Sequence, residues 1–308
     1  MLLGAQVRQA GGLLRALARA EGMRAEAIQV FAQSPRQWRS PSHGDEVLAA
    51  FGDARRRSAT VGISFCHAPY LVNLATPDPE MHARSCRCLT DNLAAAARMG
   101  AAGLVVHPGS HLGAGLETRL DGIAVALRTA LDEVWSEGWR CPILLENTAG
   151  AGGAVGRSFD ELARIIEGAG GDGRIGVCLD TQHLWASGVA FTTTEAADAV
   201  VEALHRSVGL ERLACLHLND SKVELGAGRD RHENLGQGAI GEAGLRALLG
   251  QPRLQGLPVI LEVPGLAGAG PEAEDLAVAR RLHTEALAAR RAGDVGDRER
   301  REGGTCGR

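Results

Sequence analysis

Eight short apolar segments alternate with eight segments of helical character, and this alternation limits the fold more than any other feature of the sequence. The apolar segments span 2–7, 27–31, 61–66, 103–106, 142–145, 175–179, 213–218 and 258–263. The helical segments lie at about 11–21, 46–57, 79–98, 120–134, 158–168, 194–208, 241–250 and 272–290. In 120–134, for example, apolar residues recur at the i, i+3, i+4 and i+7 spacing of one helix face. Eight strand and helix repeats predict a single (β/α)₈ barrel, with an open doubly wound sheet as the alternative.

Composition narrows the class of protein further. No apolar run approaches the ~18 residues of a membrane span, and no leader with a basic and then an apolar part begins the chain, so we expect a soluble, cytoplasmic protein. The seven cysteines are scattered without CxxC spacing, which indicates reduced thiols. From residue 290 the sequence turns to Arg, Asp, Glu and Gly. We therefore predict a barrel domain over 1–289 and a disordered charged tail over 290–308.

Histidine and carboxylate side chains stand where the apolar segments end. In chain order they are His67, His107, Glu146, Asp180 with His183, His217, then Asp230 and His232 in the following loop, and Glu262. A charged residue next to a strand buried on both faces is costly unless it has partners. Since the carboxyl ends of all strands in a (β/α)₈ barrel meet on one face, these residues are expected to gather there as an active site.

Five imidazoles and four carboxylates are too many ligands for one ion. Mixed imidazole and carboxylate ligation suits zinc or manganese, with zinc favoured by the histidines, and three ligands per ion leave an open catalytic position. Such ions lower the pKa of a bound water and stabilise the attacking and leaving oxygens of a displacement at phosphorus. The net charge of −4 does not itself indicate a nucleic-acid partner, but three divalent ions would outweigh four carboxylates and make this face attract an anion.

Several longer motifs surround these ligands, and together they resemble the endonuclease IV family over about residues 3–265. The motifs are HAPYLVNL at 67–74, HPGSH at 107–111, LENTAG at 145–150, GVCLDTQH at 176–183, HLNDSK at 217–222, and DRH at 230–232 followed by LGQGAIG at 235–241. The family consists of metal-dependent endonucleases that act on apurinic and apyrimidinic sites during base-excision repair. The resemblance thus implies a double-stranded DNA substrate. From the lack of a long apolar run we expect no membrane partner, and we take a monomer as the default state.

The resemblance also implies roles for the ligands. One zinc ion would be held by His67, His107 and Glu146; Glu146 would bridge to a second that takes Asp180, His217 and Glu262; a third would take His183, Asp230 and His232. A hydroxide positioned by Glu146 would attack the phosphate 5′ to the abasic nucleotide, leaving a 3′-hydroxyl and a 5′-deoxyribose phosphate. Manganese could replace zinc at one or more sites, and blocked 3′ ends would be further substrates.

The DNA contacts that the family implies lie on loops. Arg36, Tyr70 and Leu71 would enter the minor groove, and Lys222, Arg229 and Arg231 would bind phosphates. From chemistry alone, the pair at 70–71 could equally pack against the protein. The chain also departs from the family: Gln6 and Arg8 stand where His and Ser are usual, and Gln182 stands where Cys is common. These departures affect the surroundings of the ligands and leave the ligands intact.

Two other functions are consistent with parts of the pattern. Sugar isomerases and epimerases of the xylose-isomerase type also place Glu, Asp, His and Glu at successive strand ends around one or two metals. The third set, His183, Asp230 and His232, distinguishes the hypotheses, because proton transfer between sugar carbons does not require it. A non-catalytic protein that binds damaged DNA is the other alternative.

Overall fold

Eight parallel strands close into a barrel in the computed structural model, which describes residues 1–41 and 43–303, with side chains described as far as residue 292. The strands are β1 Leu2–Gln6, β2 Ala27–Phe31, β3 Ile63–His67, β4 Leu104–Val106, β5 Ile143–Glu146, β6 Ile175–Asp180, β7 Leu213–His217 and β10 Pro258–Leu261. Every strand pairs with its neighbours in sequence order, and β10 closes on β1. The predicted (β/α)₈ barrel is thus confirmed, and each strand lies at one of the eight apolar segments.

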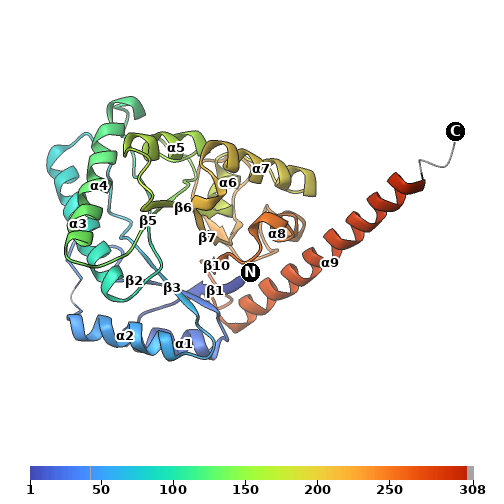
Figure 1. The fold of residues 1–308 in the computed structure, drawn as a ribbon, viewed down its shortest axis with the longest axis horizontal. Coiled ribbons are helices and arrows are strands. Elements are labelled where there is room, and N and C mark those ends of the chain that lie inside the picture. Colours follow the sequence, from blue (N-terminus) through green and yellow to red (C-terminus); the bar gives the residue numbers. More distant parts are fainter. Residues whose placement is uncertain (42, 304–308) are drawn as a thin grey trace.

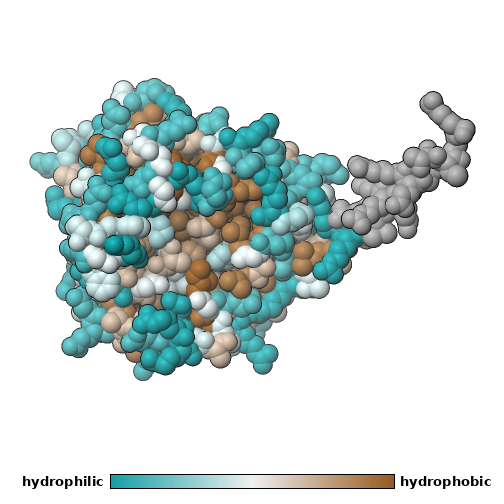
Figure 2. All heavy atoms as spheres, in the orientation of Figure 1, coloured by the Kyte–Doolittle hydropathy of each residue, from teal (hydrophilic) through white to brown (hydrophobic). Residues whose placement is uncertain are grey.

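A ring of helices surrounds the barrel (Figure 1). These are α1 Leu13–Gly22, α2 Asp45–Arg57, α3 Pro79–Arg98, α4 Leu120–Ser136, α5 Phe159–Gly168, α7 Thr194–Ser207, α8 Gly241–Leu249 and α9 Ala273–Gly303. Short 3₁₀ turns lie at Leu116–Thr118, Leu210–Arg212 and Pro252–Leu254. In α4 the residues of the predicted face, such as Ile123, Leu127 and Leu131, are buried. The visible surface is mostly hydrophilic with smaller apolar patches, as expected for amphipathic helices (Figure 2).

Three small elements were not predicted. Helix α6, Thr181–Ala186, follows β6 directly, and its first turn is capped by Asp180, whose Oδ1 accepts a hydrogen bond from the His183 amide at 2.8 Å. Strands β8 Asp220–Ser221 and β9 His232–Glu233 form an antiparallel pair at the base of the loop after β7. Elements this short contain too few residues to show a period in the sequence.

Helix α9 extends well past the barrel, and its backbone stays helical to Gly303 (Figure 1). This differs from the disordered tail predicted for 290–308, of which residues 304–308 lie outside the described residues. Alanine, arginine and glutamate have high helix propensity, which explains how a charged segment can continue a helix that the barrel has already started. Arg290 still belongs to the packed part, with its Nη1 atom 2.9 Å from Asp198 Oδ1 on α7.

An apolar layer fills the middle of the barrel. It consists of Ala27, Phe65, Val105, Leu144, Cys178, Cys215 and Ile260, one from each strand except β1, where Gly4 brings the backbones close. The six cysteines in the described part of the chain are free thiols. Within the same residues, no helix has the length and apolar character needed to cross a membrane. The apolar layer forms the floor on which the candidate site stands.

Candidate metal centre

A polar layer lies directly above the apolar one. Two positions further along each strand the side chains are Gln29, His67, His107, Glu146, Asp180, His217 and Glu262. Successive side chains of a strand alternate between faces, so a step of two keeps these groups inside the barrel mouth. Glu146, Asp180 and His217 are completely buried. All six strand-end ligands predicted from the sequence therefore converge at one place.

The first group of donors centres on one oxygen of Glu146. The Nε2 atoms of His67 and His107 lie 3.0 and 2.8 Å from Glu146 Oε2. The other ring nitrogen of His67, Nδ1, lies 2.7 Å from the carbonyl oxygen of Ala68. A proton on Nδ1 would donate to that carbonyl, which leaves the Nε2 lone pair directed at the site.

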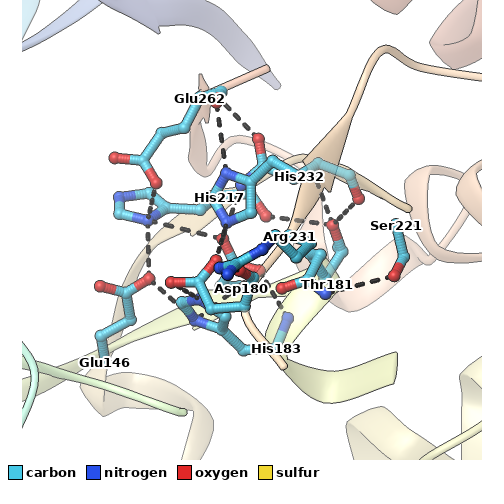
Figure 3. Close-up of polar contacts among 12 residues, drawn as sticks. Glu146, Asp180, Thr181, His183, His217, Ser221, Arg231, His232 and Glu262 are labelled. Atoms are coloured by element: carbon cyan, nitrogen blue, oxygen red, sulfur yellow. Dashed lines mark hydrogen bonds and ion pairs between the residues drawn. The ribbon is translucent and has the colours of Figure 1, made fainter. Parts of the chain in front are cut away.

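The second group uses the other oxygen of Glu146 (Figure 3). His217 Nδ1 lies 3.0 Å from Glu146 Oε1, 3.2 Å from Glu262 Oε2 and 3.8 Å from Asp180 Oδ2. Because each carboxylate oxygen of Glu146 faces a different group, this one residue connects the two. That is the arrangement a bridging carboxylate requires.

The third group joins α6 to the loop after β7. The Nε2 atoms of His183 and His232 lie 3.3 and 3.1 Å from the two carboxylate oxygens of Asp230. Both Nε2 atoms are buried and have no hydrogen-bond partner, whereas each Nδ1 atom lies within 3.2 Å of a backbone carbonyl. Asp180 also lies within 4.8 Å of both imidazoles, so it stands between the second and third groups.

Mutual electrostatics keep the donors charged. Burial lowers the pKa of the imidazoles, but the carboxylates outweigh it: the pKa of His183 and His217 lies well above the usual value, and that of His232 rises to about 9. Burial raises the pKa of Glu262, yet His217 beside it brings that pKa down to about 2. Buried carboxylates thus hold protons on buried imidazoles, which is costly unless a cation can take the place of those protons.

The donor chemistry fits divalent metal ions. Potential ligand atoms lie within 4.8 Å of one another in three groups of imidazoles and carboxylates: His67, His107 and Glu146; Glu146, Asp180, His217 and Glu262; and Asp180, His183 and His232. Asp230 approaches the third of these groups through its separate contacts with His183 and His232. A further group contains Cys178, Cys215 and His217. Cys178 and Cys215 are buried in the apolar layer below, and burial raises the pKa of the Cys178 thiol, so we assign these cysteines to the core.

Carboxamide side chains hydrogen-bond to the predicted ligands, and the sequence did not reveal these contacts. Gln29 donates to Glu262 Oε1 at 2.7 Å, and its Oε1 lies 3.0 Å from His217 Nε2. Asn219 donates to Asp180 Oδ2 at 2.6 Å and accepts from the Glu262 amide at 2.8 Å. The available signal for Gln29 was a polar residue in the middle of the apolar segment 27–31. Such partners fix the rotamers of metal ligands.

The glycine-rich motif at 235–241 has a structural purpose. The buried carboxylate of Asp220 accepts hydrogen bonds from the amides of Gly236, Gly238, Ile240 and Gly241 at 2.9–3.2 Å. A Cβ atom on Gly238 would lie 2.4 Å from the Ser221 carbonyl oxygen, so only glycine fits. The motif wraps the loop around Asp220 beside the ligand-bearing strand β7.

The predicted DNA-contacting residues lie on loops around the mouth of the barrel, here called the rim. The Tyr70 amide donates to the Pro35 carbonyl at 3.1 Å, which places the loop of Arg36 beside Tyr70. Tyr70 is 59% exposed, although its ring also makes edge contacts with Phe31 and His67, while Leu71 is half-buried. The side chains of Lys222, Arg229 and Arg231 are exposed on or beside the loop between β8 and β9. Their roles toward DNA stay predictions.

Comparison with known proteins agrees with this geometry. The family model described as "Xylose isomerase-like TIM barrel" matches residues 15–283. "Probable endonuclease 4" of Chloroflexus aggregans is 38% identical over 279 residues, covering 91% of this chain and 96% of that protein. Its counterpart in Oleidesulfovibrio alaskensis is 41% identical over 283 residues, covering 91% and 95%.

Solved structures give the same result. Endonuclease IV from Thermus thermophilus is 36% identical, with a TM-score of 0.79 over 92% of this chain and 100% of that one. A D-tagatose 3-epimerase-like protein has a TM-score of 0.70 at 18% identity, covers 95% of this chain and 99% of its own, and shares the fold alone. The resemblance seen in the motifs is confirmed, and the chain belongs to the endonuclease IV family of xylose isomerase-like TIM barrels.

Proposed function

We propose that the protein is a DNA-repair endonuclease that hydrolyses the phosphodiester 5′ to an abasic site, leaving a 3′-hydroxyl and a 5′-deoxyribose phosphate. Membership of the endonuclease IV family supports the DNA substrate. The observation that carries the proposal is the third group of donors. The buried Nε2 atoms of His183 and His232 both face Asp230, at 3.3 and 3.1 Å, next to two groups that already share Glu146.

Three ions would be held by the three groups: His67, His107 and Glu146; Glu146, Asp180, His217 and Glu262; and His183, Asp230 and His232. Five imidazoles favour zinc, with manganese able to replace it. When bound, such ions make a nucleophile from water near neutral pH and neutralise charge on the phosphate oxygens. The protein contributes the fixed directions of its donors, with Glu146 presenting one oxygen to each of two groups.

The cavity beside the ligands suits a nucleotide without its base. It measures about 280 Å³ and is lined by Tyr70, Asn73, His107, Gly109, Ser110, Thr148, Ala149, Gly150, His183 and Asp230, among others. This volume lies just below the range of typical ligand sites, about 300–1,000 Å³. Gly109 adopts φ +106° beside Asn73, where a Cβ atom would collide, so the loop comes close enough to narrow the cavity. A sugar phosphate would fit better than a complete nucleotide.

The rim would bind the rest of the duplex. Lys222, Arg229 and Arg231 are exposed beside Asp230, whose own side chain is 52% exposed, and would contact phosphates near the reacting one. Arg36, Tyr70 and Leu71 would enter the minor groove and keep the abasic nucleotide out of the helix. Activity on blocked 3′ ends, a monomeric state and a cytoplasmic location stay predictions from the sequence.

Neither alternative function explains the third donor group, which consists of His183, Asp230 and His232. Moving a proton between sugar carbons gives His183, His232 and Asp230 no role, and the epimerase-like structures resemble the chain at fold level only. A non-catalytic protein that binds damaged DNA would not require three complete donor groups. Both alternatives are outcomes of the same experiment.

That experiment uses an end-labelled duplex with one tetrahydrofuran analogue of an abasic site. The analogue cannot undergo β-elimination, so any cut must arise by hydrolysis. We expect a cut 5′ to the analogue and a 3′ end that a DNA polymerase extends. Tight binding without a cut would instead favour a damage-binding protein, and neither binding nor cutting by the metal-loaded protein would favour a sugar substrate.

A further inference from the structure

Gln182 is a completely buried carboxamide at the base of the third donor group. Its Nε2 donates to the carbonyl oxygen of Arg229 at 3.0 Å and to the hydroxyl of Ser221 at 3.2 Å. Its Oε1 is buried and has no hydrogen-bond partner. An unpaired buried acceptor destabilises a fold. A glutamine at this position therefore indicates that the hydrogen bonds donated by its Nε2 have a role. The position often holds cysteine in the family that the chain resembles.

Helix α6 holds the loop that connects β8 and β9. Trp185 Nε1 donates to the Val223 carbonyl at 3.1 Å, and the amides of Gly226 and Gly228 donate to carbonyls of α6 at 3.1 and 2.9 Å. The contact of Gln182 with Arg229 is the last of this series and the nearest to the donor group. Helix α6 is therefore hydrogen-bonded to the β8–β9 loop at several points, and Gln182 fixes the last part of that loop.

Asp230 follows Arg229 directly, so the amide contact restrains the carboxylate that His183 and His232 share. His183 is in turn the residue after Gln182. One side chain therefore couples the two separate segments that supply this group. On the other side of Asp230, the Lys222 amide donates to the Arg231 carbonyl at 2.9 Å, so the Gln182 contact fixes the backbone on the side of Arg229.

We infer that Gln182 is a positioning residue that sets Asp230 against His183 and His232 and so determines the affinity of the third ion. The same contact would hold the backbone between the side chains of Arg229 and Arg231 at the rim. This inference rests on the proposed function, because it takes the third donor group to be a metal site. It concerns a residue that departs from the family pattern and contacts none of the reacting atoms itself.

The decisive variant is Gln182→Met, which keeps the length of the side chain and removes both the donor and the unpaired acceptor. We expect the affinity for the third equivalent of zinc to fall about 10- to 100-fold, the usual effect of losing a partner that orients a ligand. Thermal stability should stay equal or rise, since an unsatisfied oxygen is removed. The readouts are zinc competition titration, hydrogen exchange over 223–231 in the metal-free protein, and thermal unfolding.

Gln251→Met is the matched control. Gln251 is also a buried glutamine, but it lies before β10 and donates to Asp198 on α7, away from the predicted ligands. The Gln251→Met variant should bind every equivalent of zinc with the affinity of the wild type.

Two results would overturn the inference. In one, Gln182→Met binds the third equivalent as the wild type does and shows the same exchange over 223–231. In the other, all equivalents and the unfolding temperature fall together, as a merely structural role predicts. If the wild type itself bound no third ion or left the tetrahydrofuran duplex intact, the proposed function would fail instead. Hydrogen exchange tests Gln182 independently of the proposed function. If exchange over 223–231 in metal-free Gln182→Met matched that of the wild type, Gln182 would not be a positioning residue.

Discussion

Two layers of side chains occupy adjacent levels of the same barrel and differ in chemistry far more than in burial. Phe65, Leu144 and Ile260 belong to the lower layer; two positions on, His67, Glu146 and Glu262 belong to the upper one. Strand geometry places both sets inside the barrel in the same way. The lower layer packs apolar side chains from seven of the eight strands against one another. The upper layer keeps charges out of water at a cost in stability, which indicates that selection there acts on chemistry.

The largest effect is expected from Glu146→Gln, which removes a charge from the upper layer at nearly constant volume. Because both oxygens face donor groups, the variant should lose ions from two sites, and cleavage should fall at least about 10³-fold, corresponding to several kcal/mol of lost charge stabilisation. Cleavage of the tetrahydrofuran duplex and metal content measured on one sample provide the test. Undiminished metal-dependent cleavage would remove Glu146 from the mechanism.

Leu144→Ala makes the complementary change in the lower layer of the same strand. The truncated side chain leaves a cavity, so the free energy of unfolding should fall by about 2–5 kcal/mol. The number of ions bound per folded chain should stay the same. Urea unfolding and metal analysis measure the two quantities. A folded Leu144→Ala protein that has lost its ions would show that the layers are not separable.

The pH dependence should distinguish metal-free from metal-loaded protein. His232 has a folded pKa of about 9, above the unfolded value near 6.5, so its ion pairs stabilise the metal-free fold fully below pH 6.5, and that stability is lost as pH rises through 9. Glu262, at about 2, adds stability above its unfolded value that is lost as pH falls toward 2. Metal binding needs deprotonated imidazoles and should strengthen as pH rises.

Unfolding temperatures from pH 6.5 to 9.5, with and without zinc, would measure this contrast. We expect the metal-free curve to fall toward the alkaline end and the difference between the two curves to widen. Metal-free protein that gains stability over this range would contradict the charge pairing in the upper layer.

The smallest effect is expected at the rim above both layers. Arg231→Ala should weaken binding of the duplex and lower the salt dependence of log K by about one unit, as expected for one lost phosphate contact. Turnover at saturating DNA should change little. Arg128→Ala, an exposed arginine on the outer helix α4, is the matched control and should leave the salt dependence as it is. An identical salt slope in both variants would exclude Arg231 from the DNA contact.

The sequence predicts much of this molecule because strong local patterns determine it. The apolar segments predicted the barrel strands, and polar residues at strand ends, such as His67 and Glu146, predicted the donor groups. The orienting amides were not foreseen, since Gln29 and Asn219 act through contacts between segments far apart in the chain. Helix α6 is too short to show a period, and the helical backbone of 290–303 reflects propensity that a composition argument overlooks.

Stepwise reloading of metal-free protein with zinc tests the central claim most directly. At each equivalent, bound zinc and the rate of hydrolysis of the tetrahydrofuran duplex would be measured on the same sample. If the three donor groups form the catalytic centre, hydrolysis should be absent without metal and should increase to its maximum as zinc approaches three ions per chain, always with a cut 5′ to the lesion and a 3′-hydroxyl. Full activity in protein stripped of metal, or no hydrolysis by fully loaded protein, would contradict the claim.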